Sequence, residues 1–226
     1  MKNSIEVIFE DNHLLVLNKP ALLATMGVEA GKDSLVVQAK SYLKNTYNKP
    51  GNVFLGIVSR LDSFVSGVIV MARTSKAAAR LNEQFAKSQV EKKYWAIVPS
   101  RRCLDSESLE HWLIKDESQH RMVCTDPDTN GAKRAELRYR RLGEFQDHSL
   151  LEVELITGRK HQIRVQMSST QKPIVGDRKY GSKTPFRKGI ALHSYQLTIE
   201  HPTLKQRKTF TQAPPDWWNI GNFISD

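Results

Sequence analysis

The chain has 226 residues, of which 39% are hydrophobic and 26% charged, and its 34 lysines and arginines exceed its 24 aspartates and glutamates to give a net charge of +10. This composition excludes a disordered or fibrous chain and predicts one large globular domain or two closely packed lobes. No apolar run is long enough for a signal peptide or a membrane span, so we expect a cytoplasmic protein without membrane contact. Cys103 and Cys124 form no C-x-x-C pair, which argues against a zinc site and favours a reducing compartment.

The first half of the chain predicts short strands and two helices. Asp33 or Ser34 can cap a helix that runs to about Asn45, and Thr74 can cap a second helix over 75–88. Strands are expected at 5–9, 14–17, 53–58, 68–71 and 94–98.

The second half predicts mainly strands, with a short helix that opens at Thr157-Gly158. Strands are expected at 111–115, 122–125, 135–141, 150–156, 192–199 and 208–211. The helix carries His161 and Arg164 three positions apart, and taken alone it is typical of an exposed basic helix. We therefore expect an α+β fold with a mixed, largely antiparallel central sheet flanked by helices and loops. It would form a single domain over residues 1–226.

Positive charge is concentrated late in the chain. Residues 159–188 hold nine lysines and arginines against the single acidic residue Asp177. Without context such a run is a solvated face, but it is also the pattern that a polyphosphate backbone attracts, because neutralised phosphates release their counterions.

Asp62 is the first candidate for chemistry. It lies in a loop that ends at Gly67, between two strands expected to be buried, and loops on rigid sheets project side chains into clefts. On pattern alone an aspartate in a loop is more often a turn residue that bonds its own backbone. An arginine beside a buried carboxylate would keep it ionised and fix its orientation.

Five motifs in order resemble the RluA family of pseudouridine synthases over roughly residues 7–218. The family's H-R-L-D-x-x-T-S-G signature corresponds to Ser59 through Gly67, and its T-G-R-x-H-Q-I-R segment to Thr157 through Arg164. The remaining matches are K-P-x-G-L at 19–23, K-x-Y at 92–94 and H-P-I-x-G-D-x-x-Y-G at 172–181. The resemblance implies the pseudouridine synthase catalytic fold with an RNA cleft across its sheet, as a single domain without the separate N-terminal RNA-binding module that some family members carry.

The resemblance also implies roles for the matched residues. Asp62 would be the catalytic aspartate, Tyr94 the aromatic residue over the target base and Arg164 the partner of Asp62. Arg60 would enter the RNA where the target nucleotide leaves its stack, since a buried uracil must flip out before a protein group can reach it. The other candidate RNA-binding residues are Ser59, Arg159, Lys160, His161, Arg178 and Lys179.

The implied reaction is the isomerisation of uridine to pseudouridine. It breaks the N1–C1′ bond, rotates the uracil and joins C5 to C1′, so neither a cofactor nor a metal is expected. The carboxylate can attack C1′ or remove a ribose proton to give a glycal, and the sequence leaves both routes open. The expected partner is structured RNA, a stem-loop of ribosomal or transfer RNA, bound by a monomer.

Three residues depart from the family pattern. Ser59 stands where the family usually has histidine, Val65 replaces the usual threonine and Gln166 stands where histidine is common. The changes at Ser59 and Val65 motivate an alternative, a catalytically silent RNA-binding homologue. A second alternative is a glycosidase-like enzyme on small nucleosides, but no second carboxylate accompanies Asp62 in its loop.

Overall fold

The chain forms two compact units, and the computed structural model describes residues 5–27, 29 and 32–224. The first unit contains Met1–Glu91 and Ser194–Ala213, and the second contains Lys92–His193 and Pro214–Asp226. Among the described residues, no helix is both long and apolar enough to cross a membrane.

The first unit is built on strands that neighbour one another in the order β1, β2, β4, β10, with β11 paired to β10. The pairs β1–β2, β2–β4 and β10–β11 are antiparallel. All seven residues of β4 are buried, which makes it the central strand of the unit's core. The strands are β1 (Glu6–Glu10), β2 (Leu14–Lys19), β3 (Gly56–Ile57), β4 (Ser66–Ala72), β10 (Leu192–Glu200) and β11 (Arg207–Thr211).

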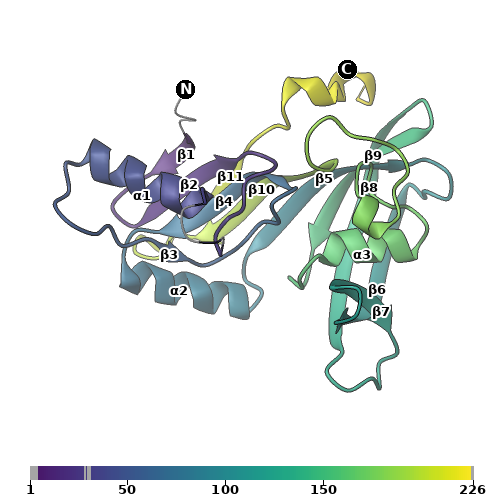
Figure 1. Ribbon diagram of the computed structural model, residues 1–226, viewed down its shortest axis with the longest axis horizontal. Helices are drawn as coiled ribbons and strands as arrows, with labels where there is room; N and C mark the ends of the chain where they lie inside the picture. The colour runs from purple at the N-terminus through teal and green to yellow at the C-terminus, as the bar shows by residue number, and fades with distance from the viewer. Residues whose placement is uncertain (1–4, 28, 30–31, 225–226) are drawn as a thin grey trace. The chain divides into compact units, whose positions relative to one another are not determined.

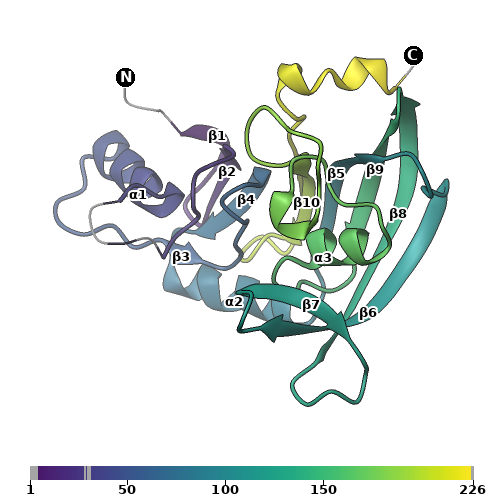
Figure 2. The same ribbon diagram turned by 45° about the vertical axis from the view of Figure 1, so that its right-hand side comes forward.

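Two capped helices accompany these strands, as Figures 1 and 2 show. Helix α1 (Leu35–Thr46) begins after Ser34, whose side chain accepts the Val37 N–H. Helix α2 (Ser75–Ala86) begins after Thr74, which accepts the Ala77 N–H in the same way. Both caps satisfy backbone donors that the first helical turn leaves open, and both confirm the helix starts that the sequence predicts.

The second unit is an antiparallel sheet in the order β5, β9, β8, β6, β7. Its strands are β5 (Glu91–Pro99), β6 (Ser106–Asp116), β7 (Arg121–Thr125), β8 (Lys133–Phe145) and β9 (His148–Leu155). Helix α3 (Gln162–Ser169) lies against β6, β7 and β8 (Figure 2). Short 3₁₀ turns follow, η1 (Arg178–Tyr180), η2 (Asp216–Trp218) and η3 (Ile220–Asn222). The predicted α+β fold with a largely antiparallel sheet is confirmed.

Three details of the prediction are wrong. The strand expected at 53–58 is only Gly56–Ile57, paired with Ala72 and Met71 at the end of β4. Since β2 pairs along one edge of β4, the other edge is shared with β10, which leaves β3 only this end.

The other two errors concern α3, which begins at Gln162 rather than at Thr157-Gly158 and is buried rather than exposed. All six residues from Gln162 to Met167 are buried. The polar ones among them are accommodated by partners distant in sequence: Gln162 donates to the Glu136 carbonyl, and Gln166 donates to the carbonyls of Leu109 and Ala135. Buried polar groups are tolerated when they are hydrogen-bonded in this way.

Candidate functional site

Asp62 lies in the β3–β4 loop, residues 58–65, and backbone-directed bonds fix this loop. The Leu61 N–H donates to the Thr25 hydroxyl at 3.2 Å, and that hydroxyl donates to the Leu61 carbonyl at 2.8 Å. The Val65 N–H closes a turn onto the Asp62 carbonyl at 3.1 Å. Asp62 itself is half-buried. Its position is therefore set by the main chain on both sides, and the residue keeps part of its surface exposed to solvent.

Gly67 follows this loop as the second residue of β4, and no other residue fits there. Gly67 has a φ of +110°, and a Cβ there would lie 2.3 Å from the Ser194 carbonyl oxygen. The Ser194 hydroxyl also donates to the Val68 carbonyl at 3.0 Å. This close approach of β10 fixes the start of β4, and with it the end of the loop that carries Asp62.

Lys19 supports the same loop, although its motif alone assigned it no role. Its side chain is fully buried, and its ammonium donates to the carbonyls of Pro20 at 2.8 Å, Leu23 at 2.7 Å and Ser63 at 3.3 Å. Burial lowers the pKa of Lys19 to about 7, and the negative charge of Asp62 opposes this shift. Lys19 thus places a titratable positive charge within electrostatic reach of Asp62.

Ser59 and Arg60 precede Asp62 in this loop. Ser59 is half-buried and Arg60 is exposed, so the guanidinium predicted to enter RNA is accessible. Val65 is buried at 2% exposure. The β3–β4 loop therefore brings three of the predicted site residues together.

Arg164 is held from the interior of the second unit. Its Nε donates to Asp177 Oδ2 at 2.7 Å and its Nη2 to Asp177 Oδ1 at 2.8 Å, with both side chains almost fully buried. A guanidinium has five N–H donors, so this two-point bond is compatible with a second carboxylate partner. The pairing of Arg164 with Asp62 stays a prediction. Asp177 lies in the matched motif at 172–181, but the resemblance assigned it no role.

His161 precedes α3 in a left-handed conformation with a φ of +55°. Its Nδ1 lies 2.8 Å from the hydroxyl of Tyr180, which is buried and also accepts the Met122 N–H at 3.1 Å. The Arg164 guanidinium lies over the Tyr180 ring, 4.9 Å from its centroid. Tyr180 therefore joins His161 and Arg164 into one cluster, although His161 is not on the helix as its spacing suggested.

Tyr94 lies on β5, half-buried, opposite Val153 of β9. Its neighbour Lys92 is close enough to Gly158 that a Cβ there would lie 3.5 Å from the ammonium. Burial lowers the pKa of Lys92, and the charge of Arg159 lowers it further. The start of β5 and the segment before α3 thus share a positively charged neighbourhood.

The predicted phosphate-binding cations are accessible. Arg159, Lys160, Arg178 and Lys179 are all exposed. Two other members of the basic run are not, because Arg164 is clamped by Asp177 and Lys172 donates to Glu107 at 2.6 Å with its own side chain buried. The basic run therefore divides into exposed cations that can meet phosphates and interior cations that hold the fold.

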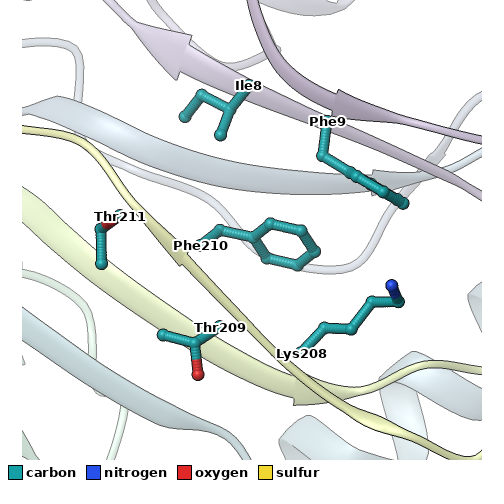
Figure 3. A pocket seen from close by; sticks show the side chains of 6 residues that line it. All are labelled: Ile8, Phe9, Lys208, Thr209, Phe210 and Thr211. Atoms are coloured by element: carbon teal, nitrogen blue, oxygen red, sulfur yellow. The ribbon is translucent and has the colours of Figure 1, made fainter.

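A separate shallow pocket of about 400 Å³ lies beside β1 and β11 (Figure 3). Phe9 and Phe210 line it with their rings 5.3 Å apart, and the Lys208 ammonium lies 5.1 Å from the Phe9 ring centroid. None of the predicted site residues lines it. Within the described part of the chain, no group of three or more His, Cys, Asp or Glu side chains is arranged to hold a metal ion.

Known proteins resemble this chain in both sequence and fold. A ribosomal large subunit pseudouridine synthase D from Xylella fastidiosa is 37% identical over 212 residues, which cover 88% of this chain and 62% of that protein. The protein of the same name from Zymomonas mobilis is 33% identical over 93% of this chain and 69% of its own length. The chain thus spans about two thirds of the length of these relatives.

The structure agrees with this likeness at the level of the fold. The human RNA pseudouridylate synthase domain containing 4 protein superposes with a TM-score of 0.77 at 24% identity, over 95% of this chain and 90% of that one. Residues 13–169 match the family described as RNA pseudouridylate synthase. The chain belongs to the RNA pseudouridylate synthase family.

Proposed function

We propose that the chain is an RNA pseudouridine synthase, an isomerase that converts uridine in structured RNA to pseudouridine. The observation that carries this proposal is the setting of Asp62. It stands in the family's signature segment, on a loop tied to Thr25 by two hydrogen bonds, and it is half-buried with the buried Lys19 within electrostatic reach. A carboxylate that must meet a ribose needs a fixed backbone and a place that is not sealed in the interior.

Asp62 is the catalytic carboxylate in this proposal. It either attacks C1′ to form an ester or removes a ribose proton to form a glycal, and in both routes the N1–C1′ bond breaks and the uracil turns to present C5. When the C5–C1′ bond forms, the ester bond to Asp62 breaks in the first route, and Asp62 returns the proton to the ribose in the second. The C5 proton passes to solvent and N1 takes up a proton, so atoms and electrons balance without a cofactor, and none is proposed.

Tyr94 and Arg164 complete the proposed catalytic set. Tyr94 supplies an aromatic face for the extruded base and a hydroxyl that can take part in proton transfer. Arg164 supplies the positive charge that keeps Asp62 ionised. Arg60 fills the gap that the flipped nucleotide leaves in the RNA, as its exposure permits.

The proposed substrate is ribosomal RNA. The two relatives reported above are named for the large ribosomal subunit, and a transfer RNA stem-loop is the second choice. Recognition would use Ser59 and His161 beside the exposed cations Arg159, Lys160, Arg178 and Lys179. We further propose that the chain acts as a monomer in the cytoplasm, with residues 1–226 serving as one catalytic domain.

A catalytically silent RNA-binding homologue is the competing proposal, favoured by Ser59 and Val65. Tritium release distinguishes the two, because the hydrogen at C5 leaves only when C5 joins C1′. Large-subunit ribosomal RNA and transfer RNA labelled with [5-³H]uridine are incubated with the protein, and release into water is counted. We expect release from ribosomal RNA, and RNA binding without release from any substrate would favour the silent homologue.

A further inference from the structure

Leu22 adopts a backbone conformation that its side chain disfavours. Its φ is +68°, in the left-handed region where glycine is at ease and a branched side chain crowds the following carbonyl. The family segment that this stretch resembles has glycine at this position. Strain of this kind persists where surrounding structure enforces it, and it clusters at functional sites. The presence of leucine at this position therefore needs a reason other than its backbone conformation.

The Leu22 side chain gains little from packing, because 58% of it is exposed. Its backbone is tied to the neighbour of Asp62: the Leu22 N–H donates to the Ser63 carbonyl at 2.7 Å. The residue after Ser63 is Phe64, which is 46% exposed. Two large apolar side chains thus flank the backbone on which Asp62 stands, and both face solvent.

We infer that Leu22 and Phe64 form an apolar platform for the unstacked bases next to the target nucleotide, an inference that rests on the proposed function. When a nucleotide flips out, the bases beside it lose a stacking neighbour and expose their faces. Aromatic and apolar side chains cover such faces in single-stranded nucleic acid. Cations bind phosphates regardless of sequence, so this platform gives the enzyme a preference for unpaired bases near the target.

RNA suits this surface better than a protein partner does. A partner seated on Leu22 and Phe64 would cover the loop that carries Asp62 and block the carboxylate. Two side chains are also far short of the roughly 800 Å² that each side of a stable protein interface buries. The RNA substrate, in contrast, must reach Asp62 in any case.

The test uses Leu22→Gly, Phe64→Ala and a matched control, Leu204→Gly. Leu204 is 55% exposed and belongs to the turn between β10 and β11 of the same unit, where its φ is not positive. Dissociation constants are measured by fluorescence anisotropy for a ribosomal stem-loop and for a fully paired duplex of the same length, at several salt concentrations. Tm and the KM for tritium release are measured alongside.

We expect Phe64→Ala to raise Kd and KM for the stem-loop about tenfold and Leu22→Gly about fivefold. Affinity for the duplex and the salt dependence should stay unchanged, because every cation that meets a phosphate is still present. Leu22→Gly should keep or raise the Tm, since it relieves the left-handed strain, while Leu204→Gly should lower the Tm slightly and leave Kd unchanged. Phe64→Trp should retain wild-type affinity.

Wild-type Kd for the stem-loop in both Leu22→Gly and Phe64→Ala overturns the inference, as does an equal loss for stem-loop and duplex. These outcomes are separate from failure of the proposed function. A wild-type protein that releases no tritium refutes the activity, whereas the Kd comparison still decides the platform.

Discussion

The Asp62 loop and helix α3 are fixed by different means. Thr25 and Lys19 bond mainly carbonyl and amide groups of the loop, so its geometry depends little on the side chains that the loop carries. Helix α3 is fixed by its own side chains instead: Arg164 pairs with Asp177, and Gln162 and Gln166 donate to main-chain carbonyls of the sheet. The difference predicts where substitutions are tolerated: the loop should accept a change of side chain at Ser59, whereas the helix should not accept one at Arg164.

The largest expected effect comes from breaking the helix clamp. Asp177→Asn leaves the Arg164 guanidinium buried without its counter-charge, which should cost about 3–5 kcal/mol of unfolding free energy. Urea denaturation measures this loss. Asp105→Asn is the matched control, because Asp105 pairs with Arg141 at the surface with 87% of its side chain exposed, and it should cost less than about 1 kcal/mol. Equal losses for the two variants would show that the clamp is not what secures α3.

The protonation of Lys19, which supports the Asp62 loop, should instead make the free energy of unfolding depend on pH. Its folded pKa of about 7 lies below the ordinary 10.5, so between these values the unfolded chain binds more protons than the folded one, and stability rises with pH. The stability of wild type relative to Lys19→Met should therefore rise from about pH 7 towards 10.5, by at most about 1.4 kcal/mol per pH unit. Denaturation at a series of pH values measures the difference, and a flat difference over this window would contradict the assignment.

Removing the Thr25 hydroxyl that ties the loop should destabilise the protein less than Asp177→Asn does, and it should mainly slow turnover. Thr25→Val leaves the N–H and carbonyl of Leu61 without their partner, at a cost of about 1–3 kcal/mol. Because Asp62 follows directly, kcat should fall at least tenfold while KM changes little. Thr211→Val, on the exposed face of β11, serves as the control. A kcat unchanged by Thr25→Val would show that the loop needs no such tie.

The smallest effect on stability is expected where the basic run faces solvent. Lys160→Gln should leave unfolding unchanged and reduce the slope of log Kd against log salt by about 1, because one fewer phosphate is neutralised. Lys172→Gln should instead lower the free energy of unfolding and leave the slope unchanged, since Lys172 is buried against Glu107. Anisotropy titrations across salt concentrations measure both slopes. A larger reduction in slope for Lys172→Gln than for Lys160→Gln would contradict the division of the basic run into exposed and interior cations.

Most of the fold could be predicted from the sequence because it depends on local signals. Caps at Ser34 and Thr74 and alternating apolar residues are readable in short windows. Strand β3 could not be bounded this way, because its length depends on how much of the β4 edge β10 occupies. The expected exposure of helix α3 is wrong for a similar reason. Its polar residues are buried by partners 13 to 57 positions away, which no local pattern contains.

In the candidate site, too, some residues could be found from the sequence and others only from the folded structure. Motif positions identified Asp62, Tyr94 and Arg164, but the role of Lys19 depends on three carbonyls that converge only after folding. Asp177 and Tyr180 stood in a matched motif without an assigned function, and their bonds to Arg164 and His161 appear only in three dimensions. The exposure of Leu22 at a positive φ is likewise invisible to a pattern.

The most direct test of the central claim is the chemistry of Asp62. Asp62→Asn keeps the size of the side chain and the backbone bonds of its loop, so the variant should fold and bind the ribosomal stem-loop with wild-type affinity. Tritium release from [5-³H]uridine RNA should fall to the uncatalysed background, because neither attack on C1′ nor removal of a ribose proton is open to an amide. Release at the wild-type rate by Asp62→Asn would contradict the assignment of this carboxylate to the reaction.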